Sequence, residues 1–257
     1  MMKNNTLKKV LAAAVSAFML MGMTACGGDK ETDTAAEGAA KTTVQAAEDA
    51  EIKNFIAPEI GEEIAVIKFK DYGEVKIKLF PETVPEAVEN FKGLANMNYY
   101  DELIFHRIIP NFMNQGGDPR GNGTGGNSMW GGEFDGGIGE GLYHFSGAVA
   151  YANSGSTATN GSQFYIVNTP ADYVYYGGLA SFEELEAYGT VVAPNVQEAY
   201  LQHGGAPFLD GGYTVFGQVI EGMDVIYAIA QVETDENDKP LKQVQMESVR
   251  IVEYTGE

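Results

Sequence analysis

Short stretches in which polar and apolar residues alternate recur along the chain from residue 63 onward. Residues 63–69 and 74–80 alternate in this way on both sides of Asp71-Tyr72-Gly73, whose residues favour a tight turn, so we expect a β-hairpin. Further strands are expected within 103–118 and over 147–152, 162–167, 213–219 and 244–254. Many short strands in a hairpin-rich order favour an all-β barrel or sandwich over a parallel α/β fold.

Helical patterns interrupt this alternation in two places. Apolar residues recur at helical spacing over 84–94, where Thr83 fits an N-cap and Pro85 falls in the first turn. A second helix is expected over 223–230. The first pattern indicates a helix that packs on a core and carries no chemistry of its own.

The start of the chain differs in composition from the rest. Three lysines precede an apolar run over residues 10–23 that is too short to span a bilayer comfortably, which is typical of a secretory signal peptide over residues 1–25. Met23-Thr24-Ala25-Cys26 resembles the lipobox of bacterial lipoproteins, with Met23 where Leu is usual. We therefore expect an extracytoplasmic protein, lipid-anchored through Cys26 to the bacterial cell membrane. The alternative is that Cys26 is an unmodified residue near a cleavage site.

Beyond this segment, composition and charge limit the domains and the partners. Residues 26–50 hold the lipidated Cys26 and a stretch of small and charged residues that we expect to be a flexible linker, followed by one folded domain over 51–257. The net charge is −20, or −23 without residues 1–25, which hold three lysines and no acids. This acidity argues against a nucleic-acid partner, which needs a basic face. Because Cys26 is the only cysteine, no intramolecular disulfide can form.

The stretch from Leu103 to Asp118 carries the candidate chemistry. It is strongly apolar but includes Arg107 and Gln115, and an arginine on a half-buried strand needs a partner or a wet cleft. One interpretation is a core strand pair from which Arg107 extends to the surface. The other is a groove with a floor of Phe112 and Met113, in which Arg107 and Gln115 are the polar contacts.

Other kinds of site find little support. His106 should point to the opposite side of the strand from Arg107 and is interpreted as structural. His144 and His203 lack metal-ligand spacing, so we expect no metal and no cofactor. Glu133 and Asp135 lie in a glycine loop and are expected to be solvated rather than catalytic. The dinucleotide-like glycine pattern over 121–126 lacks a βαβ context and is discarded.

Several motifs in order resemble the cyclophilin family of peptidyl-prolyl cis/trans isomerases. They are Phe105-His-Arg-Ile-Ile-Pro110, Phe112-Met113, Gln115-Gly-Gly-Asp118, Asn122-Gly-Thr-Gly-Gly126, Ala152-Asn153, Asn160-Gly-Ser-Gln-Phe164 and Val215-Phe-Gly217. The resemblance extends over roughly 64–253. It implies an eight-stranded antiparallel β-barrel capped by two α-helices, and an enzyme that isomerises X-Pro bonds in proline-containing polypeptides and assists the folding of exported proteins.

The resemblance also implies site residues. Arg107 matches the catalytic arginine of the family. The matching substrate-binding positions are Phe112, Met113, Gln115, Gly123, Ala152, Asn153, Gln163, Tyr165, Phe208, Leu209 and Tyr213. Within this set Phe112, Met113 and Leu209 would line the proline pocket, and Gln115 and Asn153 would bond to the substrate backbone.

Three of these positions depart from the family pattern. Tyr165 replaces a pocket Phe, and its hydroxyl needs a partner or water. Phe208 stands where the best-known members have Trp, and Tyr213 where many have His, so the affinity for cyclosporin-type ligands is affected more than catalysis. The rival hypothesis is a proline-peptide binding module or holdase chaperone that uses the same groove, which would not require a cation at Arg107.

A helical insert at about 170–206 distinguishes this chain, because most family members have a short link there. Ser181-Phe-Glu-Glu184 and Asn195-Val-Gln-Glu198 have the pattern of capping boxes, and Gly189 and Gly204-Gly205 have that of helix ends. Two hypotheses stay open. The insert either packs beside the groove and changes substrate choice, or it covers an exposed strand edge and stabilises the fold.

Overall fold

The computed structural model describes residues 49–256. The predicted signal peptide, Cys26 and nearly all of the linker lie outside the described residues. The strands are β1 (Glu63–Phe69), β2 (Gly73–Leu79), β3 (Ile104–Phe105), β4 (Arg107–Ile109), β5 (Met113–Gly116), β6 (Ala148–Tyr151), β7 (Phe164–Val167), β8 (Val215–Glu221) and β9 (Val244–Glu253). The helices are α2 (Pro85–Asn96), α3 (Phe182–Ala187), α4 (Pro194–His203) and α5 (Met223–Ile229), with 3-10 turns η1 (Thr157–Thr159) and η2 (Pro207–Leu209).

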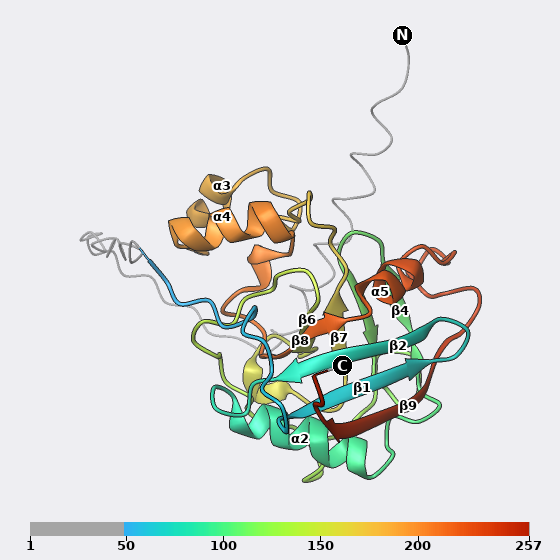
Figure 1. Ribbon diagram of the computed structural model, residues 1–257. Helices are drawn as coiled ribbons and strands as arrows, with labels where there is room; N and C mark the ends of the chain where they lie inside the picture. The colour runs from blue at the N-terminus through green and yellow to red at the C-terminus, as the bar shows by residue number, and fades with distance from the viewer. Residues whose placement is uncertain (1–48, 257) are drawn as a thin grey trace, which may run out of the picture. The chain divides into compact units, whose positions relative to one another are not determined.

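The strands form one antiparallel barrel, as predicted. Their order is β3-β9-β1-β2-β8-β6-β7-β5-β4 (Figure 1). The chain from β3 to β4 closes the ring, because β3 pairs with β9 and β4 pairs with β5. Residues 49–256 contain nine strands where eight were expected. The difference arises at His106, which separates β3 from β4 although its backbone N–H still bonds to the Gln115 carbonyl at 3.0 Å.

The two expected cap helices are α2 and α5, which lie on opposite sides of the β1–β2 hairpin in Figure 1. Helix α2 buries its apolar face, in which Phe91 is fully buried. The prediction that Thr83 caps α2 is wrong. Val84 occupies the N-cap without a side-chain hydrogen bond, and Pro85 begins the helix, because the fixed φ of proline suits the first helical position. Helix α5 receives a hydrogen bond at its Ile226 carbonyl from Asn114 at 3.0 Å.

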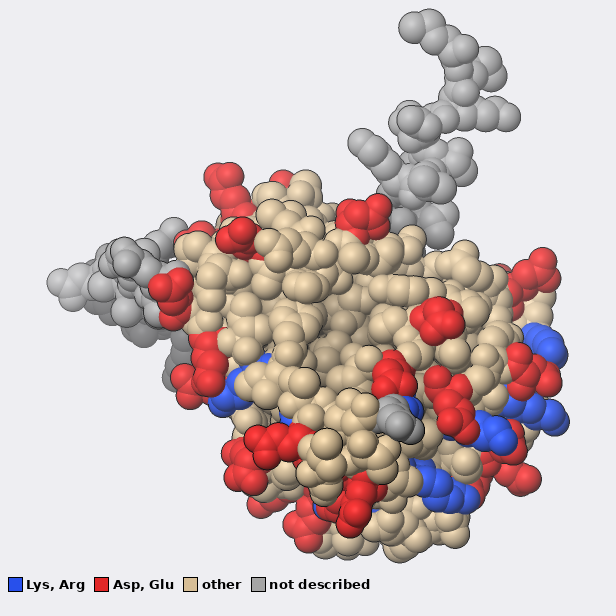
Figure 2. Space-filling view, in the orientation of Figure 1, with Lys and Arg blue, Asp and Glu red and all other residues tan. Residues whose placement is uncertain are grey.

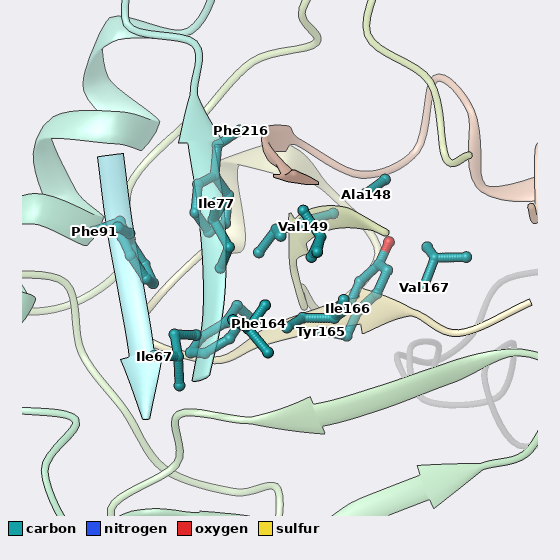
Figure 3. Close-up of a cluster of buried hydrophobic side chains, with 14 of the residues drawn as sticks. Ile67, Ile77, Phe91, Ala148, Val149, Phe164, Tyr165, Ile166, Val167 and Phe216 are labelled. Atoms are coloured by element: carbon teal, nitrogen blue, oxygen red, sulfur yellow. The ribbon is translucent and has the colours of Figure 1, made fainter. Parts of the chain in front are cut away.

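The barrel core is aromatic and continues across several elements. The Phe91 ring lies 5.5 Å from that of Phe164 on β7 and 5.0 Å from that of Phe216 on β8. Figure 3 shows Phe164 among the core side chains, whereas the hydroxyl of its neighbour Tyr165 points away from Phe164 and Ile67. Successive residues of β7 therefore serve different sides of the sheet, as the twofold period of a strand requires.

The insert contains α3 and α4 and has its own small core. Buried side chains of the insert pack with Phe145, which precedes β6; they are Val192, Val196, Ala199 and Tyr200. The N-cap of the first predicted capping box is confirmed, since the Ser181 hydroxyl accepts the Glu184 N–H at 3.2 Å, whereas the Glu184 carboxylate accepts the N–H of Ala180 rather than of Ser181, at 2.9 Å. The second is wrong: α4 begins at Pro194, and Asn195 instead exchanges two hydrogen bonds with the Ala50 backbone, at 3.0 and 2.7 Å.

Charged side chains are spread over the surface. On the face shown in Figure 2 acidic residues are widely distributed, and most of the visible lysines and arginines lie along the right edge. Lys68 of β1 pairs with Glu247 of β9 at 3.1 Å, and Lys76 of β2 pairs with Glu221 of β8 at 2.9 Å. Exposed pairs of this kind contribute little to stability. Within residues 49–256 no helix has both the length and the apolar character needed to cross a bilayer.

Candidate active site

Strand register puts the predicted polar residues in one row across the barrel wall. Arg107 lies opposite Gln115, and Gln115 lies opposite Tyr165. The neighbouring row holds Ile108, Asn114, Ile166 and Val149, which are all fully buried. Because adjacent residues on a strand face opposite sides and paired residues share one side, the Arg107 row faces outward, where Arg107 and Gln115 are half-exposed.

Arg107 is held at one end of this row by a residue far along the chain. Its Nε lies 3.4 Å from an Asp238 carboxylate oxygen. The Asp238 carbonyl also accepts the Ile108 N–H at 2.8 Å, so the loop after α5 is fixed against the free edge of β4. Asp238 adopts a left-handed φ of 63° to do this. The sequence analysis did not find Asp238, because no local pattern links it to Arg107.

The other predicted polar positions are linked to this row through Gln115. Gln115 donates to the Gln163 side-chain oxygen at 3.0 Å, and Gln163 donates to the Gly125 carbonyl at 2.8 Å. Ala152 donates its N–H to the Gln163 carbonyl at 3.0 Å. The Asn153 amide donates to the Gly212 carbonyl at 3.0 Å. These residues therefore form one connected polar margin.

Asp118 fixes the loop that carries Gly123. Its carboxylate accepts four backbone N–H groups, those of Arg120 (2.9 Å), Asn122 (3.0 Å), Gly123 (2.7 Å) and Thr124 (3.2 Å). Burial by itself would raise the pKa of Asp118, and these hydrogen bonds outweigh burial and lower the pKa from the ordinary 3.8. Gly123 has a φ of 84°, which a glycine adopts without strain.

Aromatic side chains form a wall beside Arg107. The Phe112 ring lies 5.6 Å from that of Phe208, and Tyr175 of the insert contacts both, at 4.9 Å and 5.4 Å. Met113 and Leu209 are buried, 2% and 6% exposed. Tyr175 was not among the predicted site residues. The cluster Tyr173, Tyr175 and Tyr176 was visible in the sequence, but nothing in it indicated which tyrosine would face the groove.

Tyr165 forms the middle of the site and begins a buried hydrogen-bond network. Its hydroxyl lies 3.0 Å from His144 Nε2, and His144 Nδ1 lies 2.8 Å from Asp210 Oδ1. The Tyr200 hydroxyl donates to Asp210 Oδ2 at 2.7 Å. An ionised carboxylate only accepts, so Nδ1 carries the proton, and in the neutral imidazole Nε2 accepts the Tyr165 hydroxyl. Burial raises the pKa of Tyr165 and of Tyr200 well above the ordinary value, so both remain protonated donors.

The network supplies the partner that the Tyr165 hydroxyl needs. The sequence analysis considered His144 only as a metal ligand, and it missed the network formed with Asp210 and Tyr200. Tyr213 packs against Tyr165, with the two ring centroids 5.9 Å apart. Tyr165 of the barrel and Tyr200 of the insert are thus joined through His144 and Asp210, which lie far from Tyr165 in the sequence.

The remaining histidines have structural surroundings. His106 is 7% exposed, and burial is the main reason that its pKa is lowered. The His203 ring lies 4.2 Å from that of Phe55, tilted by 36°. Glu133 and Asp135 are exposed. Among residues 49–256, no three His, Cys, Asp or Glu side chains are grouped so as to hold a metal ion.

Comparison with known proteins identifies this arrangement. The family described as cyclophilin type peptidyl-prolyl cis-trans isomerase/CLD matches residues 64–251. A Staphylococcus aureus protein named as a peptidyl-prolyl cis-trans isomerase is 41% identical over 191 residues, which cover 74% of this chain and 93% of the relative. A Streptococcus pyogenes protein named as a bifunctional phosphatase/peptidyl-prolyl cis-trans isomerase is 43% identical over 184 residues, 70% of this chain. The match spans only 37% of that bifunctional relative.

Solved structures agree with the sequence relatives. The cyclophilin type peptidyl-prolyl cis-trans isomerase of Cryptosporidium parvum has a TM-score of 0.59 and 29% identity, and the match covers 75% of this chain and 98% of that one. Its crystal structure in the presence of the dipeptide Ala-Pro has a TM-score of 0.58 and 29% identity, covering 74% and 99%. The barrel, the ordered motifs and these relatives agree that the chain belongs to the cyclophilin-type peptidyl-prolyl cis-trans isomerases.

Proposed function

We propose that the protein accelerates rotation about X-Pro bonds in exported polypeptides, with Arg107 as the catalytic residue. Amide resonance opposes this rotation with a barrier of about 18–20 kcal/mol. X-Pro bonds nevertheless populate both isomers, which makes their slow exchange a folding step worth catalysing. The reaction breaks no covalent bond, so it requires positioning and electrostatic stabilisation rather than a nucleophile or a metal.

Arg107 can stabilise the twisted state selectively. When the peptide plane is broken, the prolyl nitrogen regains a lone pair and becomes a hydrogen-bond acceptor, whereas the planar amide nitrogen accepts poorly. A guanidinium donor held beside that nitrogen therefore binds the transition state more strongly than the ground state. This difference in binding is what lowers the barrier.

The observation that carries the proposal is the state of the Arg107 side chain. Asp238 contacts it through Nε, and Asp238 is its ion-pair partner within residues 49–256. Among residues 49–256 neither Nη group has a hydrogen-bond or ion-pair partner. The half-exposed guanidinium therefore combines a fixed orientation with unused N–H groups, which suits a transient acceptor.

The remaining site residues have roles in holding the substrate. Phe112, Met113, Leu209 and Tyr165 would surround the prolyl ring. Gln115, Gln163 and Asn153 would bond to the backbone on one side of the proline, while the other side rotates. Cyclosporin-type ligands would compete for the same groove, with Phe208 and Tyr213 altering their affinity.

The test compares the purified protein with Arg107→Ala and Arg107→Lys on X-Pro tetrapeptides. We expect Arg107→Ala to lower kcat/KM by roughly 10²–10³, the cost of removing one preorganised donor. Arg107→Lys retains the charge but loses the planar donor geometry and should recover only part of this loss. If both folded variants isomerise peptides at the wild-type rate, Arg107 is not catalytic. If wild type binds proline peptides without accelerating exchange, the groove is a binding module.

We also propose that the domain is tethered outside the cytoplasm by a lipid on Cys26. The support is the signal-peptide and lipobox pattern of residues 1–26 and the acidic, small-residue composition of the linker. A flexible linker of this kind would allow the groove to reach polypeptides that emerge at the membrane. The proposed clients are therefore exported chains that have not finished folding.

A further inference from the structure

Backbone hydrogen bonds join the first part of the insert to the segment that leads into the groove wall. The Tyr175 N–H donates to the Gly205 carbonyl at 2.8 Å, and Val174 forms a parallel bridge with Gly205. The next residue, Ala206, donates to the His144 carbonyl at 2.8 Å. These backbone bonds hold Tyr175 beside the segment that leads directly into η2, which carries Phe208 and Leu209.

The Tyr175 ring completes an aromatic cluster with two predicted substrate-binding residues. It is inclined by 45° to the Phe112 ring and is nearly perpendicular to the Phe208 ring, at 86°. Gly177, two residues later, lies against the same ring: a Cβ at that position would come within 2.7 Å of Phe208. The insert therefore packs closely onto the groove wall, and Tyr175 is its aromatic contact there.

The phenol also lies near the predicted catalytic group. Tyr175 is half-buried. Burial raises the pKa of its hydroxyl, and Arg107 and Asp238 are close enough to act on that pKa in opposite directions. Tyr175 thus belongs to the aromatic wall and lies within electrostatic reach of Arg107, whereas Gln163 and Asn153 are hydrogen-bonded to Gly125 and Gly212.

We propose that Tyr175 is a specificity-determining residue that contacts the substrate side chain next to proline on the Arg107 flank, and that it favours aromatic or large apolar side chains there. This inference rests on the proposed use of the groove for X-Pro peptides. A substrate ring would add to the existing cluster of Phe112, Phe208 and Tyr175. One aromatic pair in a partly desolvated site accounts for a preference of about three- to tenfold.

The position at one end makes the proposal directional. A peptide crossing the groove places one neighbour of proline toward Arg107 and the other toward Asn153. The proposal assigns the contact with Tyr175 to the first of these neighbours. Loss of the ring should therefore relax discrimination on one side of proline and leave the other side unchanged, which a general loss of stability cannot do.

The experiment measures kcat/KM by NMR exchange for two peptide series, one varying the residue before proline and one the residue after it, each comparing Phe with Ala. The purified protein is compared with Tyr175→Ala, Tyr175→Phe and Tyr188→Ala. Tyr188 is the control, since it belongs to the same insert and is 80% exposed. We expect a three- to tenfold Phe preference in one series, lost in Tyr175→Ala and retained in Tyr175→Phe and Tyr188→Ala.

Two results would overturn the inference. One is an unchanged Phe/Ala ratio for Tyr175→Ala in both series, and the other is an equal change in both series. The proposed function fails separately, because it predicts that wild type accelerates exchange and that Arg107→Ala does not. An active wild type with unaltered ratios in Tyr175→Ala therefore refutes the role of Tyr175 alone.

Discussion

The buried contact between Tyr165 and His144 should show strong energetic coupling between the two side chains. Both are almost fully buried, 4% and 1% exposed, and the hydroxyl and Nε2 are 3.0 Å apart. Tyr165→Phe removes the hydroxyl and leaves Nε2 without its partner. His144→Leu leaves the hydroxyl unpaired and removes one donor from Asp210. The double variant removes both ends of the Tyr165–His144 bond at once.

The magnitude follows from the groups left unpaired. An unsatisfied buried polar group costs about 1–3 kcal/mol, so Tyr165→Phe should lower the free energy of unfolding by about 2 kcal/mol. His144→Leu should cost about 4 kcal/mol, because it also removes a charge-assisted bond to Asp210. The Asp210 carboxylate keeps the Tyr200 hydroxyl and the backbone N–H at position 144. In the double variant no orphan remains at the Tyr165–His144 contact, so its cost should fall below the sum by about 2 kcal/mol.

The assay is urea and thermal unfolding of the four proteins of this double-mutant cycle, monitored by far-UV circular dichroism. A coupling energy near 2 kcal/mol is expected, which for a domain of this size separates the measured and additive Tm values by roughly 4–8 °C. Additive effects within about 0.5 kcal/mol would refute the reasoning, because they would mean that the hydroxyl and the imidazole do not satisfy one another. Tyr165→Phe also restores the residue usual in the family and serves as the mildest change to the pocket floor.

Three further predictions follow from the site and the leader. Asp238→Ala should lower kcat/KM about three- to tenfold in wild type and have no effect in Arg107→Ala, since Asp238 acts by positioning Arg107; losses that multiply in the double variant would contradict this. Asp118→Asn should lower the free energy of unfolding by about 3 kcal/mol at pH 7. The folded-state pKa of Asp118 lies below its ordinary value, so this contribution to stability is complete above about pH 4 and is lost as pH falls through the folded pKa. The urea midpoints of wild type and Asp118→Asn should therefore converge on acidification. A difference in midpoint that widens at low pH would contradict the predicted pH dependence. Cys26→Ser should move the protein from the membrane fraction to the soluble extracytoplasmic fraction, and unchanged fractionation would exclude Cys26 as the anchor.

Local sequence pattern was a good guide to the elements of the barrel. The hairpin of β1 and β2 was predicted within one residue at each end. In a strand with one buried face, the alternation of buried and exposed side chains appears in the sequence as alternation of apolar and polar residues. The late helix was placed at 223–230 and is found at Met223–Ile229. Local pattern failed at the start of α4, where the sequence offers both a proline suited to the first helical position and a capping-box residue one position later. Asn195 has a capping-box sequence, yet Pro194 begins α4 and the Asn195 amide bonds to Ala50.

The candidate site was only partly accessible from the sequence. The ordered cyclophilin motifs were enough to single out Arg107, Gln115 and Tyr165, and strand register then explains why they share one face. The catalytic role of Arg107 stays a prediction. Asp238 and Tyr175 were missed because each reaches the groove from a loop or insert whose own sequence does not specify what it will face.

The sequence by itself determined the barrel and the family and predicted part of the groove, because the alternation of residues, helical spacing and motif order can be read without knowing tertiary contacts. Only the tertiary structure decided that Asp238 orients Arg107, that His144 and Asp210 satisfy the Tyr165 hydroxyl, and that Tyr175 of the insert joins the aromatic wall. The physical reason is that these contacts join groups distant in the chain. Their partners are set by barrel closure and by the need to satisfy buried polar atoms, which no local pattern records.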